Sequence, residues 1–355
     1  MLPAALEPER FITTSPAHLL RQMLRAWPLD HQQQFFEDTL GVPLTFEAES
    51  RKYFPASHRA RDVRDALVAH ARERGVEIRS GTTVTALERE DDGWRVVTDR
   101  GEIRARAVIL ATGGLSVPKT GSDGTGLRIA EALGHTVHPL YPALTPLVAA
   151  TPIHAALSGL AVPVRMRVKT AARTRVVEGA LLFTHRGYSG PAALDASTPG
   201  ATYHVRWGEL DRDAWEPLLL HGVGQVSSLI GASLPQRLAD QLVDEAGVPP
   251  SRKLHELRRG ERLKLLELLT DYTLPVSGTE GFEKAEVTGG GVALDEVDRH
   301  TLESRKAPGV FLCGEMLDAY GPIGGHNFAW AWATGRAAGL GAVSRYNRGH
   351  VPIQT

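Results

Sequence analysis

The stretch that decides the fold is Gly309-Val-Phe-Leu-Cys-Gly-Glu-Met-Leu-Asp-Ala-Tyr-Gly-Pro-Ile-Gly-Gly-His-Asn327, close to the C-terminus. Val310 to Cys313 is a short apolar run between glycines, which predicts a buried strand. Two acids, Glu315 and Asp318, follow this strand directly. In an open α/β sheet, ligands bind outside the carboxyl ends of the strands. Carboxylates at this position could therefore accept hydrogen bonds from the hydroxyl groups of a ligand.

The same stretch continues into a glycine-rich turn and a predicted helix from Asn327 to about Ala342. The first N–H groups of a helix are unpaired and carry the positive end of its dipole, so they attract negative charge. Gly324 and Gly325 have no side chains to obstruct a flat or phosphate-bearing ligand. An acid beside a helix N-terminus suits a flavin, which has ribityl hydroxyls and a pyrimidine edge that becomes anionic on reduction. The glycine spacing alone fits an ordinary strand–turn–helix corner equally well.

Four motifs, in the same order along the chain, carry a resemblance to a known family. They are Val108-Ile-Leu-Ala-Thr-Gly-Gly-Leu-Ser-Val-Pro-Lys-Thr-Gly-Ser-Asp-Gly-Thr-Gly126, Leu182-Phe-Thr-His-Arg-Gly-Tyr-Ser-Gly-Pro191, Val287-Thr-Gly-Gly-Gly-Val292 and Gly321-Pro-Ile-Gly-Gly-His-Asn-Phe-Ala-Trp-Ala-Trp332. Together they resemble the signatures of a bacterial family of FAD-dependent oxidoreductases that includes aminoacetone oxidase and flavoproteins linked to bile-acid reduction. The resemblance covers nearly the whole chain.

The resemblance implies an α/β fold in which a Rossmann-like FAD-binding domain is interrupted by a β-barrel-like domain and a helical subdomain. The expected bounds are 1–138 and 285–355 for the FAD-binding domain, 139–208 and 273–284 for the β-barrel-like domain, and 209–272 for the helical subdomain. Apolar residues occupy every second position of Val162–Lys169, which predicts a half-buried strand of the β-barrel-like domain. A leucine-rich segment broken by prolines predicts three or four short helices in the helical subdomain.

The resemblance also implies FAD as the cofactor and hydride transfer through flavin N5 to or from a small organic molecule. No second Gly-x-Gly-x-x-Gly exists for a dedicated NAD(P) domain, so the electron partner is either oxygen or NAD(P)H acting as a transient donor at the open flavin face. The expected FAD contacts are Val84, Thr112, Gly113, Gly114, Gly314, Glu315, Asp318, Gly324, Gly325 and Asn327. For Val84, a plain sheet residue in the β-meander of residues 82–98 is almost as good an interpretation. No residue receives a catalytic role. His185 or Tyr188 could donate a proton, but a loop histidine more often makes a structural hydrogen bond.

One expected part of the cofactor site is missing. A Rossmann-type FAD domain needs a βαβ unit with Gly-x-Gly-x-x-Gly to hold the pyrophosphate, and the first glycine of this chain is Gly41. We therefore expect a truncated N-terminus and exposed edges on the strands Val108–Ala111 and Val310–Cys313. We favour a true start upstream of Met1, because the remaining motifs are intact. The alternative is a non-catalytic scaffold remnant that does not retain FAD.

Composition and charge narrow the possible partners, the expected location of the protein and the kinds of site that it can form. The 355 residues carry a formal net charge of −1, which gives no support for a nucleic-acid partner. No apolar run is long enough to span a membrane, and the first residues lack a secretory signal, so a cytoplasmic protein is expected. One cysteine excludes an intrachain disulfide, and the fourteen histidines show no metal-ligand spacing. Arg165, Arg167 and Lys169 form a basic row that could hold an anion, although a solvated strand face is the better interpretation.

Overall fold

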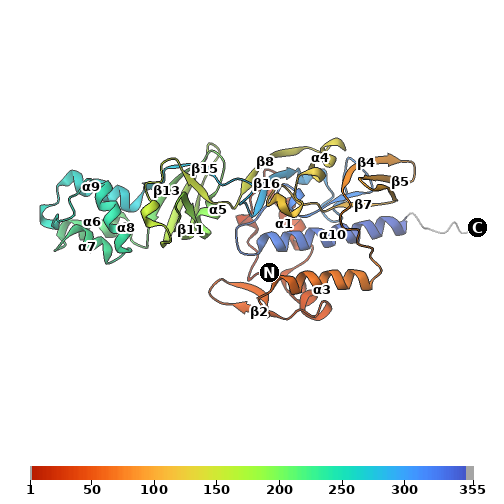
Figure 1. Cartoon of the computed structure of the whole chain (residues 1–355), viewed down its shortest axis with the longest axis horizontal. Coiled ribbons are helices and arrows are strands. Elements are labelled where there is room, and N and C mark those ends of the chain that lie inside the picture. The colour runs from red at the N-terminus through yellow and green to blue at the C-terminus, as the bar shows by residue number, and fades with distance from the viewer. Residues whose placement is uncertain (1, 349–355) are drawn as a thin grey trace, which may run out of the picture. The chain divides into compact units, whose positions relative to one another are not determined.

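The computed structural model in Figure 1 describes residues 2–348, and it divides into two compact units. The first unit is Met1–Pro142 with Val287–Thr355, and the second is Ala143–Glu286. The first unit is thus discontinuous in sequence, with the second inserted into it. The boundaries predicted from the sequence lie a few residues earlier, and residues 209–272, which the sequence predicts to be a helical subdomain, fall within the range of the second unit.

The first unit is built on two parallel strands, β7 (Val108–Leu110) and β17 (Val310–Leu312). The second edge of β17 is covered, because the Leu312 N–H donates to Leu302 and the Ser304 N–H donates to Val310. Within residues 2–348, no strand pairs with the second edge of β7, and Ile109 is 40% exposed. The predicted open edge is therefore confirmed for β7 and wrong for β17.

Within residues 2–348, three further sheets and five α-helices complete the first unit. The sheets are β1 (Leu2–Pro3), β3 (Lys52–Pro55) and β2 (Leu44–Glu47); β4 (Val84–Glu90), β5 (Gly93–Thr98) and β6 (Gly101–Ala105); and β16 (Val287–Val292) with β8 (Val137–Ala143). The helices are α1 (Ala17–Arg25), α2 (Leu29–Gln34), α3 (Ala60–Glu73), α4 (Thr125–Ala132) and α10 (His326–Arg348). The β-meander expected from the sequence is confirmed.

The triple glycine of β16 is explained by close packing. A Cβ at Gly289 would collide with the ring of Tyr141, and one at Gly291 would lie 2.6 Å from the carbonyl oxygen of Met316. Real Cβ atoms do not approach other atoms so closely. β16 can therefore pass between β8 and the segment after β17 only because Gly289 and Gly291 have no side chains.

Two local predictions are wrong. Ser15 does not cap α1, because Pro16 holds the cap position and the Ser15 hydroxyl instead accepts the N–H of Leu294 at 3.0 Å. Residues 76–78 do not form the expected strand. Val76 and Ile78 are about half exposed, and in the described part of the chain no strand lies beside them to pair with.

The second unit is a curled antiparallel sheet with helices. Its strand order is β14-β13-β10-β11-β12-β9-β15. The two outermost strands, β14 (Tyr272–Thr273) and β15 (Val276–Thr279), are separated by only two residues, so the edges of the sheet must come together. This confirms the barrel-like prediction. The other strands are β9 (Leu147–Ala149), β10 (Ala161–Lys169), β11 (Thr174–Phe183), β12 (Gly187–Ser189) and β13 (Thr202–Trp207).

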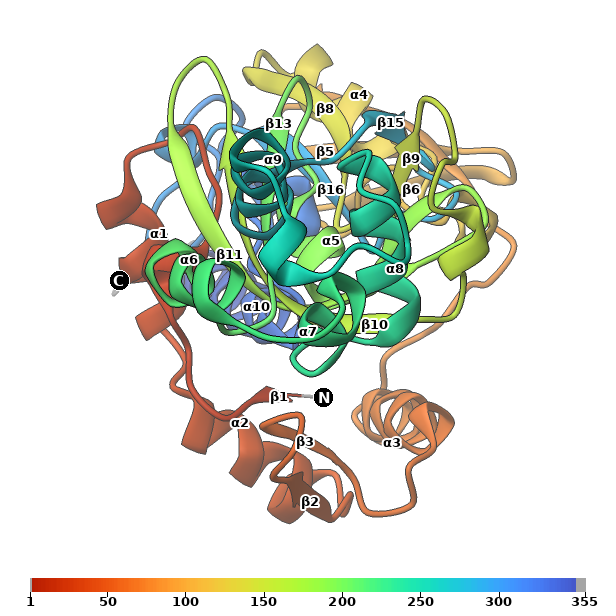
Figure 2. The same ribbon diagram turned by 90° about the vertical axis from the view of Figure 1, so that its left-hand side faces the viewer.

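One face of β10 lies in the core, as its alternation predicted. Val164, Met166 and Val168 are buried, whereas the residues between them are exposed. Trp207 stacks on Phe183 with 5.7 Å between ring centres. The helices of this unit are α5 (Gly190–Ala196), α6 (Arg212–His221), α7 (Val226–Gly231), α8 (Gln236–Glu245) and α9 (Arg259–Thr270). Figure 2 shows the same chain after a quarter turn, with α6 to α9 toward the viewer.

A buried polar cluster connects α8 to the sheet of the second unit. His154 bonds the hydroxyl of Tyr188 through Nδ1 (2.8 Å) and Glu245 through Nε2 (2.9 Å), and Tyr272 donates to the second oxygen of Glu245 (2.7 Å). Burial raises the pKa of Tyr188 and of Tyr272. Burial opposes ionisation of Glu245, but the hydrogen bonds from His154 and Tyr272 hold its pKa below the ordinary value. Tyr188 is therefore a core residue with a structural partner.

Removing the carboxylate of this cluster should destabilise the protein. Glu245→Ala leaves His154 and Tyr272 buried without their acceptor, which should cost about 3 kcal/mol of the free energy of unfolding. Urea denaturation measures this cost. The matched control is Glu267→Ala on α9, where an exposed carboxylate pairs with Lys264 at 3.1 Å and should contribute less than about 0.5 kcal/mol. Equal effects of the two variants would contradict the assignment.

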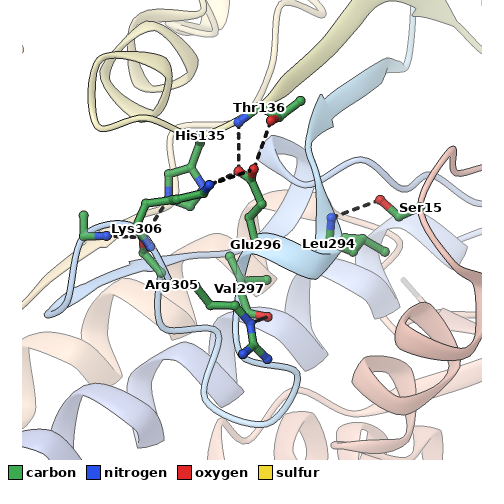
Figure 3. A network of polar contacts seen from close by, with 10 residues as sticks. Ser15, His135, Thr136, Leu294, Glu296, Val297, Arg305 and Lys306 are labelled. Carbon is green, nitrogen blue, oxygen red and sulfur yellow. Dashed lines mark hydrogen bonds and ion pairs between the residues drawn. The ribbon is translucent and has the colours of Figure 1, made fainter.

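A second network stabilises the first unit (Figure 3). The buried ring of His135 bonds Glu296 at 3.1 Å and the hydroxyl of Ser304 at 2.7 Å. Thr136 donates its N–H and its hydroxyl to the same carboxylate, at 2.8 and 2.9 Å. Burial lowers the pKa of His135. Burial alone would raise the pKa of Glu296, but the hydrogen bonds from Thr136 and His135 and the charge of Lys306 together hold that pKa below its ordinary value.

This network predicts a loss of stability in mild acid. The pKa of His135 in the folded protein lies below its ordinary value of 6.5. The stabilisation that the neutral, buried ring provides is therefore complete above pH 6.5 and is lost as the pH falls from 6.5 through the folded pKa. In His135→Gln, the free energy of unfolding should change less between about pH 8 and pH 5 than in the unaltered chain. Urea titrations at several pH values measure this. His255→Gln, at an exposed position, is the control and should leave the pH dependence unchanged.

Candidate functional site

Three sequence-predicted segments meet at the carboxyl ends of β7 and β17. Residues 112–114 follow β7, and the short helix Gly314–Met316 follows β17. Thr288 of β16 joins them: its hydroxyl accepts the N–H of Leu115 at 2.7 Å, and its own N–H donates to Glu315 Oε1 at 2.8 Å. A Cβ at Gly114 would lie 2.7 Å from Glu315 Oε1, so only glycine fits there.

A cavity of about 630 Å³ opens at this junction. Gly113, Gly314 and Glu315 line it at the strand ends. Its other walls are mostly apolar and come from the strand ends, the α1–α3 region and α10; they are Trp27, Phe35, Leu67, Ala111, Cys313, Ala331, Trp332, Gly335 and Arg336. The guanidinium of Arg336 lies 5.3 Å from the ring centre of Trp27. The cavity is therefore an aromatic-walled space with one carboxylate at its end.

Backbone geometry requires glycine at the two strand-end positions of the cavity. Gly113 and Gly314 have φ of +73° and +71°, a region that residues with a Cβ rarely adopt. The N–H of Gly314 donates to the Thr334 hydroxyl at 2.9 Å, and its carbonyl accepts the indole N–H of Trp330 at 3.0 Å. The turn after β17 is thereby tied to α10.

Glu315 is the carboxylate best placed to meet a ligand. It is largely buried, and burial raises its pKa while the hydrogen bond from Thr288 acts against this. Oε1 accepts the Thr288 N–H, and among the described residues no donor reaches Oε2. An ionised Glu315 would thus gain from additional hydroxyl donors supplied by a ligand.

Asp318 has a different environment from Glu315 and does not line that cavity. It is 2% exposed, and its Oδ2 accepts hydrogen bonds from five donors. These are the N–H and hydroxyl of Thr14 (2.9 and 2.6 Å), the hydroxyl of Thr13 (3.2 Å), and the N–H and hydroxyl of Ser15 (3.2 and 3.3 Å). Asp318 therefore holds the chain that leads into α1.

The glycine corner before α10 contacts the N-terminal segment of the chain. A Cβ at Gly325 would lie 3.1 Å from the backbone of Leu2 and Pro3, and one at Gly324 would lie 3.4 Å from Lys52. The Asn327 amide bonds the N–H and carbonyl of Gly321, at 2.8 and 3.0 Å. Burial lowers the pKa of the neighbouring His326 to about 4, so this ring is neutral near pH 7.

The remaining two predicted residues share a second cavity. Val84, at the start of β4, and Thr112 line a space of about 420 Å³ together with Ile109 of β7. The ten predicted residues are thus dispersed. Gly113, Gly314 and Glu315 line the larger cavity, and Gly114 packs against Glu315 beside it. Val84 and Thr112 line the smaller cavity. Asp318, Gly324 and Gly325 lie against the N-terminal part of the chain, and Asn327 bonds the backbone of Gly321.

Several residues at the site were not assigned to it from the sequence. Thr288 lies inside the quoted motif Val287–Val292, and its position between two glycine-rich segments could have suggested a linking role. Trp332 closes the C-terminal motif, and its alternation with alanines was the available signal. Trp27 lies in the turn between α1 and α2, and Phe35 lies just after α2. Their apolar pattern alone assigns both to the core, so nothing in the sequence pointed to a cavity wall.

Metal-binding clusters and membrane-spanning helices are absent from residues 2–348. In this range no three His, Cys, Asp or Glu side chains come together in a way that could bind a metal ion. None of the helices described has both the length and the apolar character needed to cross a bilayer. Cys313 is buried, and burial raises the pKa of its thiol to about 11.

Comparison with known proteins gives three informative matches. The ribosomal RNA dihydrouridine synthase of Escherichia coli is 34% identical over 284 residues, which cover 78% of this chain and 70% of that protein. The 3-dehydro-bile acid delta(4,6)-reductase of Clostridium scindens is 31% identical over 345 residues, covering 92% and 83%. Among solved structures, NikD, an unusual amino acid oxidase, matches at 16% identity over 94% of this chain and 83% of its own, with a TM-score of 0.31.

The family assignment follows from the extent of these matches. The model of the HI0933-like protein Rossmann domain matches residues 4–341, which is nearly the whole described chain. The bile-acid reductase matches over almost as much of the chain. The chain therefore belongs to the HI0933-like family, a bacterial family of FAD-dependent oxidoreductases with a Rossmann-type domain.

Proposed function

We propose that this chain is an FAD-dependent oxidoreductase that holds its cofactor at the carboxyl ends of β7 and β17. One observation carries the proposal: Gly113, Gly314 and Glu315 border a single cavity of about 630 Å³ at the edge where open α/β sheets bind ligands. A flat, largely apolar ring system with hydroxyl groups at one end fits the aromatic walls and the carboxylate of this cavity.

The residues present fit a flavin nucleotide in three ways. Glycine at 113 and 314 leaves no side chain between the backbone and a closely approaching ligand. Glu315 can accept hydrogen bonds from ribityl hydroxyls through Oε2. The smaller cavity, with Val84 and Thr112, offers a place for the adenine end. Bound FAD would supply hydride transfer at flavin N5, while the chain binds and orients it and excludes water through Trp27, Phe35 and Trp332.

The proposed substrate is a small organic molecule with an electron-poor carbon–carbon double bond, and the proposed electron donor is NAD(P)H. The two named relatives support reduction of the substrate by the flavin, because a dihydrouridine synthase and a delta(4,6)-reductase are both named for saturating a carbon–carbon double bond. A second candidate substrate is uridine within RNA. The similarity to the ribosomal RNA dihydrouridine synthase favours it.

A non-catalytic scaffold remains the competing proposal. It is favoured by the contacts of Asp318 and Gly325 with the N-terminal segment, which occupy two positions expected to hold the flavin. The two proposals differ in one property that is simple to measure, the retention of a yellow chromophore.

The cofactor proposal predicts a visible flavin spectrum after reconstitution of the full chain with FAD, and NADPH consumption in the presence of a conjugated enone. Glu315→Gln should weaken FAD binding about tenfold or more, because hydrogen bonds to a charged acceptor contribute about 1.5–3 kcal/mol. The same variant should keep or increase stability, since glutamine still accepts the Thr288 N–H and removes a buried acid whose pKa is raised. Titration of FAD by fluorescence quenching and urea denaturation provide the two readouts. A colourless chain supports the scaffold proposal instead.

Asp318 provides the contrasting variant. Asp318→Asn should lower the free energy of unfolding by about 2 kcal/mol, because the charged oxygen that receives five hydrogen bonds is lost. If FAD still binds to the folded fraction with unchanged affinity, Asp318 acts on the fold alone. A loss of FAD affinity without a loss of stability would instead place Asp318 at the cofactor.

A further inference from the structure

The outer face of the barrel carries cations that the proposed flavin site does not use. Residues 143–208 contain seven basic side chains and two acidic ones, although the whole chain has a net charge of −1. The basic ones are Arg165, Arg167, Lys169, Arg173, Arg175, Arg186 and Arg206, and the acidic ones are Glu178 and Asp195. The near-neutral total that suggested no nucleic-acid partner therefore hides a strongly basic segment.

Four of these cations share one surface, called here the basic face: Arg165, Arg167, Lys169 and Arg206. The first three alternate with buried residues along β10, so they all point away from the core. Arg206 on β13 stands directly opposite Arg165, and His204 stands opposite Arg167. Successive outward residues of a strand are about 7 Å apart and neighbouring strands about 5 Å apart, so the basic face is a regular grid of positive charge.

This grid is only partly neutralised. Arg165 pairs with Glu178 at 3.4 Å, and Arg167 pairs with Asp271 at 2.5 Å. The two arginines and the two acids of these ion pairs are each about half exposed or more. Exposed pairs of this kind contribute little to stability and exchange readily. Within the described residues, neither Lys169 nor Arg206 forms an ion pair. Like charges opposite one another on paired strands cost stability, so the Arg165–Arg206 pair favours an anion bound between them.

We infer that the basic face binds the phosphate backbone of single-stranded RNA. The inference rests on the second candidate substrate of the proposed function, uridine within RNA, and names the surface that would hold that polymer. A row of cations at regular spacing suits repeated phosphates, whereas a small uncharged substrate would leave the row without a role. Arginine and lysine on an exposed strand face can reach phosphates without disturbing the core residues beneath them.

The test is the binding of the full chain to a fluorescently labelled oligouridylate, measured by anisotropy over a series of salt concentrations. Each phosphate contact on a single strand contributes about 0.7 to the slope of log K against log salt. Arg165→Gln with Lys169→Gln should therefore reduce that slope by about 1.4, and should weaken binding about 25-fold at 0.1 M salt. The control removes one arginine and one lysine from α9, as Arg259→Gln with Lys264→Gln.

The outcomes separate this inference from the flavin proposal. Binding that is salt-dependent, lost in the β10 variant and kept in the α9 control supports the basic face. Absence of binding by the unaltered chain, or equal loss in both variants, overturns it. Neither measurement involves turnover, so a protein that binds FAD and reduces an enone but ignores oligouridylate refutes only the RNA surface.

Discussion

The parallel pairing of β7 with β17 is the constraint on which the candidate site depends. The two strands are about 200 residues apart in sequence, yet Val108 faces Val310 and Leu110 faces Leu312 in register. Because the strands are parallel, the chain leaves both at the same edge, and the turns at Gly113 and Gly314 come together there. Thr288 then closes the arrangement, since it bonds the segment after β7 through its hydroxyl and Glu315 through its N–H. A shift of this register by one residue would turn every inward side chain outward and separate the two turns.

Two acids three residues apart show how much the environment decides. Glu315 and Asp318 look equivalent in the sequence, as a pair of carboxylates after one strand. In the structure, Asp318 receives five hydrogen bonds from its own chain, whereas Glu315 receives one and faces a cavity. Asp318 is therefore a structural anchor for the segment that leads into α1, whereas Glu315 is open to a ligand. The difference arises from the segment Thr13–Ser15, which is some 300 residues away in sequence.

The sequence predicted those parts of the fold that local pattern determines. The alternation of Val164, Met166 and Val168 gave the buried face of β10, the turn residues of the meander gave β4 to β6, and the leucine-rich segment gave four helices. It failed where long-range contacts decide. Val76 and Ile78 have strand propensity but no neighbour to pair with, and Ser15 is drawn away from its cap position by Asp318 and Leu294. The cavity walls at Trp27 and Phe35 could not be predicted for the same reason, because apolar residues look alike in sequence whether they fill a core or border a cavity.

The buried state of Cys313 makes this chain its own reporter of conformational opening. With one thiol in 355 residues, any covalent labelling by a sulfhydryl reagent occurs at that position alone. The sulfur lies at the end of β17, almost fully enclosed, and its pKa of about 11 keeps it protonated and unreactive in the closed form. The rate at which such a reagent modifies the native protein therefore measures how often Cys313 becomes accessible, either from the cavity that it borders or by opening of the end of β17, without the need for an introduced probe.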